Sequence, residues 1–120
     1  MKEDNIIVDK TFKFGLRIVK LFLYLRERKV ERALCVQVLN SGTSVGSNVE
    51  EAIGGSSKKD FIYKLEISYR EARETRYRLR LLKESGILED KLAISLIADC
   101  DEILKILTSI LKSSKGKRNA

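Results

Sequence analysis

Apolar residues recur at steps of three and four in four separate stretches of the chain, which is the spacing of amphipathic helices. Polar residues and glycines separate the stretches. The first stretch begins at Asp9, which we expect to cap the helix. The first three predicted helices cover about residues 9–29, 30–53 and 57–85, and the fourth follows a connection at about residues 85–88.

Three short connections separate these predicted helices. Gly54 and Gly55 end the second helix, since glycine tolerates positive φ. Ser57 followed by Asp60 resembles a capping box, so the third helix is predicted to start there and to end near Gly86. Short connections make neighbouring helices antiparallel. The sequence therefore predicts an all-α, antiparallel up-down-up-down four-helix bundle.

The first predicted helix is apolar on more than half of its circumference. One apolar line is Phe12, Leu16, Val19, Phe22 and Leu23, and a second line is Phe14, Ile18, Leu21 and Leu25. A bundle of four helices covers only one side of each helix. The sequence therefore predicts self-association.

The third and fourth helices each carry one clear inward line. In the third helix it consists of Phe61, Leu65, Ser68, Ala72, Thr75, Leu79 and Leu82. In the fourth it consists of Ala93, Leu96, Cys100, Ile103, Leu107 and Ile110, whose alternating steps of three and four are typical of a coiled-coil seam. We expect one bundle domain over residues 1–111, followed by a basic flexible tail over residues 112–120.

Residues 41–47, Ser-Gly-Thr-Ser-Val-Gly-Ser, allow two interpretations. A phosphate loop would end in Gly-Lys-Ser/Thr, but Gly46 is followed by Ser47 and Asn48. In a helix, Gly42 and Gly46 lie one turn apart and let another backbone come close. We favour the helix. The residues assigned to packing or assembly are Ser41, Gly42, Ser44, Gly46, Asn48, Glu51, Glu71 and Glu74.

The composition favours a small helical protein. A chain of 120 residues makes one domain, and the absence of proline together with 43% apolar, 34% charged and 7% aromatic residues favours helices over sheets. Cys35 and Cys100 are expected to be buried free thiols in a reducing cytoplasm. The start of the chain lacks the features of a signal peptide, and charged residues interrupt the first helix, so we expect a cytoplasmic protein without a membrane span.

Basic residues exceed acidic ones by 24 to 17, giving a formal charge of +7. Part of this excess lies in the C-terminal tail and part in one line of the third helix beside Tyr69. Each group is either a solvated surface or a contact for nucleic acid. The candidate contacts are Arg70, Arg73, Arg76, Arg80, Lys83, Lys115, Lys117 and Arg118.

Catalytic chemistry has little support in the sequence. Glu51, Glu71 and Glu74 suggest a carboxylate metal site, but di-iron bundles combine such residues with histidine and this chain has none. Serine and cysteine nucleophiles also lack a histidine base. We expect no catalytic residue, metal or cofactor. Ion pairs at four-residue spacing, Glu74 with Arg78 and Glu66 with Arg70, are the simpler explanation.

Two motifs together give a family resemblance. They are residues 41–52, Ser-Gly-Thr-Ser-Val-Gly-Ser-Asn-Val-Glu-Glu-Ala, and residues 57–75 with the leucines that follow at 79, 81 and 82. Over about residues 9–112 the chain resembles the four-helix-bundle proteins encoded in intervening sequences of bacterial 23S ribosomal RNA genes. These proteins also carry the label S23 ribosomal protein, although they are not expected to be components of the ribosome.

The resemblance implies a bundle that assembles into a ring, a homopentamer, without enzymatic activity. The fold is also similar to the accessory protein of diversity-generating retroelements, whose basic barrel works with RNA and reverse transcriptase. Ser41, Gly42, Ser44, Asn48 and Glu51 match the family's second-helix motif. Asp60, Phe61, Glu71 and Glu74 match its third-helix motif, and most of these residues are expected to serve packing or assembly.

Two positions depart from the family pattern. Asn40 stands where members often have arginine, and Arg78 stands near a tryptophan position. The sequence thus predicts a non-catalytic ring-forming protein that binds RNA or DNA through basic surfaces. The alternative is a structural oligomer or an adaptor for an unidentified protein partner, with no nucleic-acid role. A small hydrolase or nucleotide enzyme is the third class.

Overall fold

Four long α-helices make up most of the chain, in a computed structural model that describes the backbone of residues 2–119 and the side chains of residues 5–116. They are α1 (Lys2–Glu27), α2 (Arg32–Ile53), α3 (Lys58–Glu84) and α4 (Asp90–Asn119). The part of the chain that is described contains no strand. The predicted all-α class is therefore confirmed.

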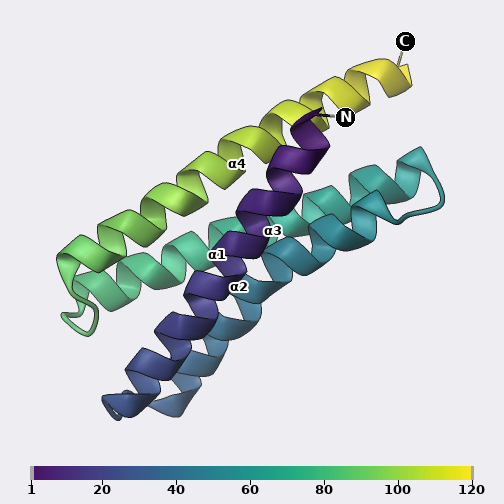
Figure 1. Cartoon of the computed structure of the whole chain (residues 1–120). Coiled ribbons are helices and arrows are strands. Elements are labelled where there is room, and N and C mark those ends of the chain that lie inside the picture. The colour runs from purple at the N-terminus through teal and green to yellow at the C-terminus, as the bar shows by residue number, and fades with distance from the viewer. Residues whose placement is uncertain (1, 120) are drawn as a thin grey trace.

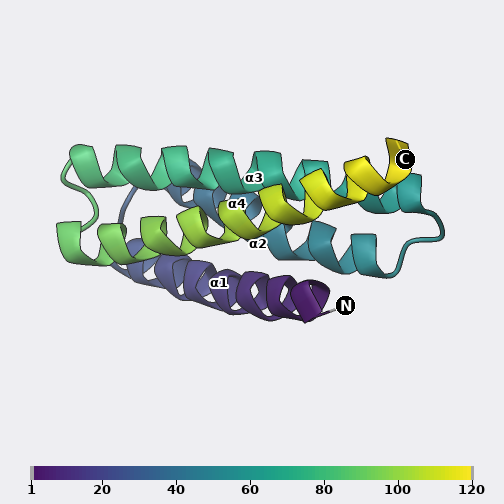
Figure 2. The same ribbon diagram turned by 90° about the horizontal axis from the view of Figure 1, so that it is seen from above.

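Each helix packs along the next one in the sequence, and α1 also contacts α4. Figures 1 and 2 show that α1 begins and α4 ends at the same end of the molecule. The molecule measures 51 × 22 × 20 Å. In Figure 1, α1 runs at an angle to α4 and its end separates from the start of α4. Two ion pairs, Lys10 with Glu102 and Arg17 with Asp99, join these two helices. The four helices therefore pack less completely between α1 and α4 than between neighbours in the sequence.

The connections follow the local sequence signals. Ser57 caps α3 by accepting a 3.0 Å hydrogen bond from the backbone N–H of Asp60. The second helix ends before Gly54, but Gly54 has φ −83°, so the positive φ expected at this end is wrong. Gly86 takes φ 79° just after α3, where a residue with a Cβ would be strained. These predicted boundaries are confirmed. Lys29, in the connection before α2, also has positive φ, 64°.

One hydrophobic core runs through the four helices, and the predicted inward lines largely form it. The core contribution of α3 includes Leu65, Ser68, Ala72, Thr75, Leu79 and Leu82, and that of α4 includes Ala93, Leu96, Cys100, Ile103, Leu107 and Ile110. Phe61 is only half-buried and Ile62 takes the inward position beside it. In α2 the apolar residues at helical spacing, Val38, Val45, Val49 and Ala52, are buried, whereas Leu34 is exposed.

The first helix begins earlier than its sequence suggested. The predicted cap, Asp9, lies inside α1 and forms an ion pair with Lys13 at 3.0 Å. The helix extends toward the N-terminus because Ile7 is fully buried and Val8 packs against the core. These residues give α1 another turn of apolar contact with the other helices.

The predicted boundary at residue 112 does not coincide with the end of a helix. The helical backbone of α4 continues through Asn119. The side chains of Lys117 and Arg118, two of the candidate contacts, lie outside the described residues. No helix in the described part of the chain has both the length and the apolar character that a membrane span requires.

Candidate nucleic-acid interface

The basic line of α3 lies on the side of the helix that faces away from the core. Because Ala72, Thr75 and Leu79 point inward, the helical period places Arg73 and Arg80 outward. Both arginine residues are exposed, and so is Arg70. None of the three forms an ion pair with a carboxylate of the described residues. The structure thus places three of the candidate contacts on one accessible surface of α3.

Two other candidate contacts are tied to carboxylates on the neighbouring helix. Arg76 Nε lies 2.6 Å from Asp101 Oδ1, and Lys115 Nζ lies 2.8 Å from Glu66 Oε2. Both pairs bridge α3 and α4. The predicted pairing of Glu66 with Arg70 is therefore wrong, because a lysine on α4 comes closer than the arginine one turn away. Lys83 is paired with Glu84 at 3.1 Å.

Two grooves follow this face along α3 and α4. The larger, of about 620 Å³, is lined by Tyr63, Glu66, Tyr69, Arg70, Thr108, Leu111, Lys112 and Lys115. The smaller, of about 350 Å³, is lined by Arg73, Arg76, Tyr77, Arg80, Asp101 and Leu104. The two tyrosines of the larger groove and the tyrosine of the smaller one come from the same helix. Basic and aromatic side chains therefore share the walls of both grooves.

Tyr63, Asp101 and Lys112 line these grooves but are not among the candidate contacts predicted from the sequence, and Lys112 belongs to the predicted tail. A signal for Tyr63 existed, because residues 63, 70 and 77 are seven apart and so fall on one side of an α-helix. No pattern in the sequence points to Asp101, because Arg76, with which it pairs, is 25 residues away.

The glycines of the second helix lie against α1 within the same chain. A Cβ on Gly42 would come within 2.8 Å of the Ile18 side chain, and a Cβ on Gly46 would come within 3.1 Å of the carbonyl oxygen of Thr11. The residues 41–47 are helical, which disagrees with a phosphate loop. At Gly46 another backbone, that of α1, does come close, whereas Gly42 faces the side chain of Ile18.

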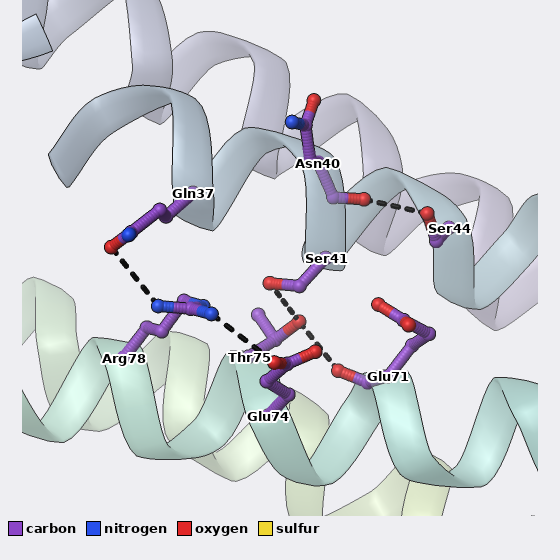
Figure 3. A network of polar contacts seen from close by, with 8 residues as sticks. All are labelled: Gln37, Asn40, Ser41, Ser44, Glu71, Glu74, Thr75 and Arg78. Atoms are coloured by element: carbon purple, nitrogen blue, oxygen red, sulfur yellow. Dashed lines mark hydrogen bonds and ion pairs between the residues drawn. The ribbon is translucent and has the colours of Figure 1, made fainter. Parts of the chain in front are cut away.

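Two buried hydroxyl contacts join α2 to α3. The hydroxyl oxygens of Ser41 and Thr75 are hydrogen-bonded at 2.9 Å, and Thr75 Oγ1 also lies 2.8 Å from the carbonyl oxygen of Glu71 (Figure 3). Nearby, Ser68 donates to the carbonyl oxygen of Val45 at 2.8 Å. Small hydroxyl side chains let the two helices approach closely while their polar atoms stay hydrogen-bonded. Ser41 is therefore a packing residue inside the chain.

A charged network covers the outside of the same helix pair. Arg78 donates to Gln37 at 3.0 Å and to Glu74 at 3.1 Å, as Figure 3 shows, which confirms the predicted pair of Glu74 with Arg78. Lys64 joins Glu51 at 3.1 Å. The contacts of Arg78 with Gln37 and of Lys64 with Glu51 both join α3 to α2. The Nε atom of Arg78 is buried without a hydrogen-bond partner among the described residues, so this arginine is only partly satisfied.

The remaining motif residues bond mostly within their own helix. Asn48 donates to the carbonyl oxygen of Ser44 at 2.8 Å, and the Ser44 hydroxyl donates to the carbonyl oxygen of Asn40 at 2.7 Å.

Burial, and secondarily the charge of Glu74, raises the pKa of the Glu71 carboxyl. A raised pKa means that the folded chain holds this proton more tightly than the unfolded chain, so lowering the pH through that range stabilises the fold.

The described side chains offer little for catalysis. No group of three or more histidine, cysteine, aspartate or glutamate residues among them is arranged to hold a metal ion. Cys35 and Cys100 are free and buried, and burial raises the pKa of the Cys100 thiol to about 12. A thiol with that pKa is almost entirely protonated at neutral pH and is a poor nucleophile.

Comparisons with known proteins agree with the four-helix architecture. A crystal structure of a protein of unknown function from the S23 ribosomal protein family of Bacteroides thetaiotaomicron VPI-5482 is 41% identical and superposes with a TM-score of 0.88. The match covers 92% of this chain and 98% of that one. The comparison with curated proteins finds no match. Residues 3–109 match the 23S rRNA-intervening sequence proteins, and the chain belongs to this family.

Proposed function

We propose that this chain is a non-catalytic, cytoplasmic protein that binds RNA or DNA and assembles into a ring. Its helices form an antiparallel up-down-up-down bundle, and the ring is the pentamer expected from the family resemblance. The face between α3 and α4 binds the nucleic acid, and the outer face of α1 joins the copies. The observation that carries the binding role is the excess of basic side chains along the two grooves.

The charges of the grooves favour a polyanionic ligand. Six basic side chains line them against two acidic ones, leaving four positive charges in excess. Both acidic residues, Glu66 and Asp101, are already paired with basic partners. The positive field of Arg70, Arg73 and Arg80 is therefore directed to solvent, where it attracts phosphates. In a ring, the positive electrostatic fields of several copies would add to one another.

The outer face of α1 supports assembly between copies. Phe12, Leu16, Val19 and Leu23 are all exposed at steps of four, three and four, which is the spacing of a coiled-coil seam. Exposed apolar surfaces of this kind mark protein interfaces. Beside them lies a groove of about 370 Å³ whose lining includes Gly15 and Gly46. The chain thus offers both large apolar side chains and a hollow that accepts them, as a second copy requires.

Salt dependence tests the binding role. Affinity for a structured RNA, a single strand and a duplex DNA should fall steeply between about 50 and 200 mM salt. Changing Arg70, Arg73 and Arg80 together to alanine should reduce the slope of log affinity against log salt by about 2 to 3, because each phosphate contact contributes about 0.7 to 0.9. Arg76 is left unchanged because its loss would leave Asp101 unpaired.

A matched control removes the same charge elsewhere. Lys20, Arg32 and Lys91 are exposed and lie outside both grooves. Their combined change to alanine should leave the slope unchanged. Equal losses from the two triple variants would mean that net charge, and not the α3–α4 face, attracts the ligand.

Light scattering at several concentrations tests the assembly separately. A stable monomer at micromolar concentration would contradict the ring. An intact assembly that binds none of the three nucleic acids would instead support a structural oligomer or a protein adaptor, the alternative function. The two halves of the proposal are therefore judged by independent measurements.

A further inference from the structure

Aromatic rings are unusually prominent on the basic face of α3. Three of the four tyrosines of the chain lie on this helix. Tyr63 is 56% exposed and Tyr77 is 55% exposed, whereas Tyr69 is half-buried beside them. An aromatic ring held in water forgoes the burial that usually stabilises it. Two such rings among arginine residues point to a ligand that offers flat surfaces as well as negative charge.

The rings and the guanidinium groups alternate along one narrow arc of the helix. At 3.6 residues per turn, positions 63, 70, 73, 77 and 80 fall within about 100° of the circumference. The rise of 1.5 Å per residue makes this arc about 25 Å long. One groove holds Tyr63 and Arg70, and the next along α3 holds Arg73, Tyr77 and Arg80. Glu66 also falls within this arc, where it is paired with Lys115, so the order along the helix is ring, paired carboxylate, cation, cation, ring, cation.

One arginine of the arc is already associated with a ring. The guanidinium carbon of Arg73 lies 6.0 Å from the centroid of the Tyr69 ring, and its NH1 donates to the Tyr69 hydroxyl at 3.4 Å. This contact restrains the guanidinium group, while the exposure of Arg73 leaves other N–H groups accessible to solvent. A restrained arginine loses less conformational entropy when it binds a phosphate.

Alternation of this kind distinguishes a single strand from a duplex. In a duplex the faces of the bases are stacked on one another, so a protein side chain outside the helix meets phosphates and base edges. In a single strand each base presents a free face on which an aromatic side chain stacks, and the backbone follows a basic groove. A tyrosine hydroxyl donates to a phosphate in either kind of ligand, but only an unpaired base offers a face on which the exposed ring stacks.

We propose that the α3–α4 face binds single-stranded nucleic acid, with Tyr63 and Tyr77 stacking on unpaired bases while the neighbouring arginines contact the phosphates. This inference rests on the proposed nucleic-acid-binding function and specifies the form of the ligand. A length of about 25 Å suits a site of a few nucleotides, at the lower end of the range for single-strand-binding modules. An unpaired RNA loop and a single strand of DNA offer the same two chemical features.

Paired substitutions test the stacking. Affinity is measured by fluorescence anisotropy at one salt concentration for a single-stranded RNA, a single-stranded DNA and a duplex of the same sequence. Changing Tyr63 and Tyr77 together to alanine should weaken single-strand binding at least tenfold and leave duplex binding unchanged. The matched Tyr63→Phe, Tyr77→Phe variant keeps both rings and should retain single-strand affinity.

Tyrosine fluorescence supplies a direct readout, because the chain contains no tryptophan. Stacked bases should quench the emission of the natural protein on titration with a single strand. The double alanine variant should lose that part of the quenching.

The outcomes separate this inference from the function on which it rests. Equal affinity for single strand and duplex, insensitive to the alanine pair but lost with Arg70, Arg73 and Arg80, would overturn the single-strand inference and keep the binding function. Absence of binding to all three ligands would overturn both. A loss of single-strand binding in the phenylalanine pair would also contradict stacking, because the rings are still present.

Discussion

Two exposed stripes, one on α1 and one on α3, differ in what separates their large side chains. On α1, Phe12 and Leu23 are 60% and 59% exposed, and Leu16 and Val19 continue the same line between them. On α3, arginines interrupt the line between Tyr63 and Tyr77. The first stripe is continuously apolar along its centre, whereas the second alternates rings with positive charge.

This difference determines which partner each stripe can accept. A helix packed on α1 would bury only apolar side chains, a favourable contact. A helix packed on the α3 stripe would also bury guanidinium groups without counter-charges, which is costly. A polyanion satisfies those groups instead. Exposed non-polar area therefore indicates a partner only when the charges beside it are considered together with it.

The largest expected effect comes from placing charge in the α1 stripe. Phe12→Asp combined with Leu23→Asp should raise the dissociation constant between copies at least a hundredfold. Burial of each side chain contributes about 1.5–3 kcal/mol, so losing both exceeds the 2.8 kcal/mol or so that a hundredfold change requires. Light scattering measures the assembly, and circular dichroism checks that the helices remain.

Ile94→Asp is the matched control for that variant. Ile94 is 57% exposed on α4 and lies outside the α1 stripe. The Ile94→Asp variant should leave the assembly unchanged. If Ile94→Asp disrupts the assembly while the α1 variant stays associated, the interface lies on the other side of the molecule.

The local helix signals were sufficient to predict much of this architecture. The cap at Ser57, the end of α2 at Gly54 and the buried line of α4 all depend on residues within a few positions of one another. The two apolar lines of α1 were also visible, but both have a helical period. Only the packing of α2 and α4 decides that Ile18 is buried and Leu16 exposed.

The candidate interface was predictable only in part. The outward position of Arg73 and Arg80 follows from the inward line of α3 and the helical period. The pairing of Glu66 with Lys115 does not follow from the sequence, because the two residues are 49 positions apart. Local spacing suggested Arg70 instead. Contacts between distant segments decide which charges remain available to a ligand, and a single sequence does not give them.

An effect of intermediate size on the unfolding free energy is expected from two glycine substitutions, one where α2 contacts α1 and one on the open side of α1. Gly46→Leu should lower the free energy of unfolding by about 1–3 kcal/mol, because its Cβ would meet the Thr11 carbonyl oxygen at 3.1 Å. Gly15→Ala should instead raise it by about 0.5–1 kcal/mol, since a Cβ at Gly15 has no neighbour within 4 Å and alanine favours a helix interior.

Urea unfolding measures both changes, and it should be done in the background of Phe12→Asp and Leu23→Asp. There, assembly no longer adds to the apparent stability. Equal stability of the two glycine variants would show that α1 and α2 do not approach as closely at Gly46 as the structure indicates.

The smallest effect concerns a charge pair at the edge of the α3 stripe. Asp101→Asn releases Arg76 from its 2.6 Å ion pair, and because both side chains are partly exposed the unfolding free energy should change by less than about 1 kcal/mol. The freed guanidinium should strengthen single-strand binding and steepen its salt slope by up to about 0.7. Asp99→Asn is the matched control, since it breaks the similar 2.6 Å pair with Arg17 between α1 and α4. It makes the same change in net charge but should leave the slope unchanged. If both variants strengthen binding equally, the effect comes from overall charge, and Arg76 does not belong to the binding surface.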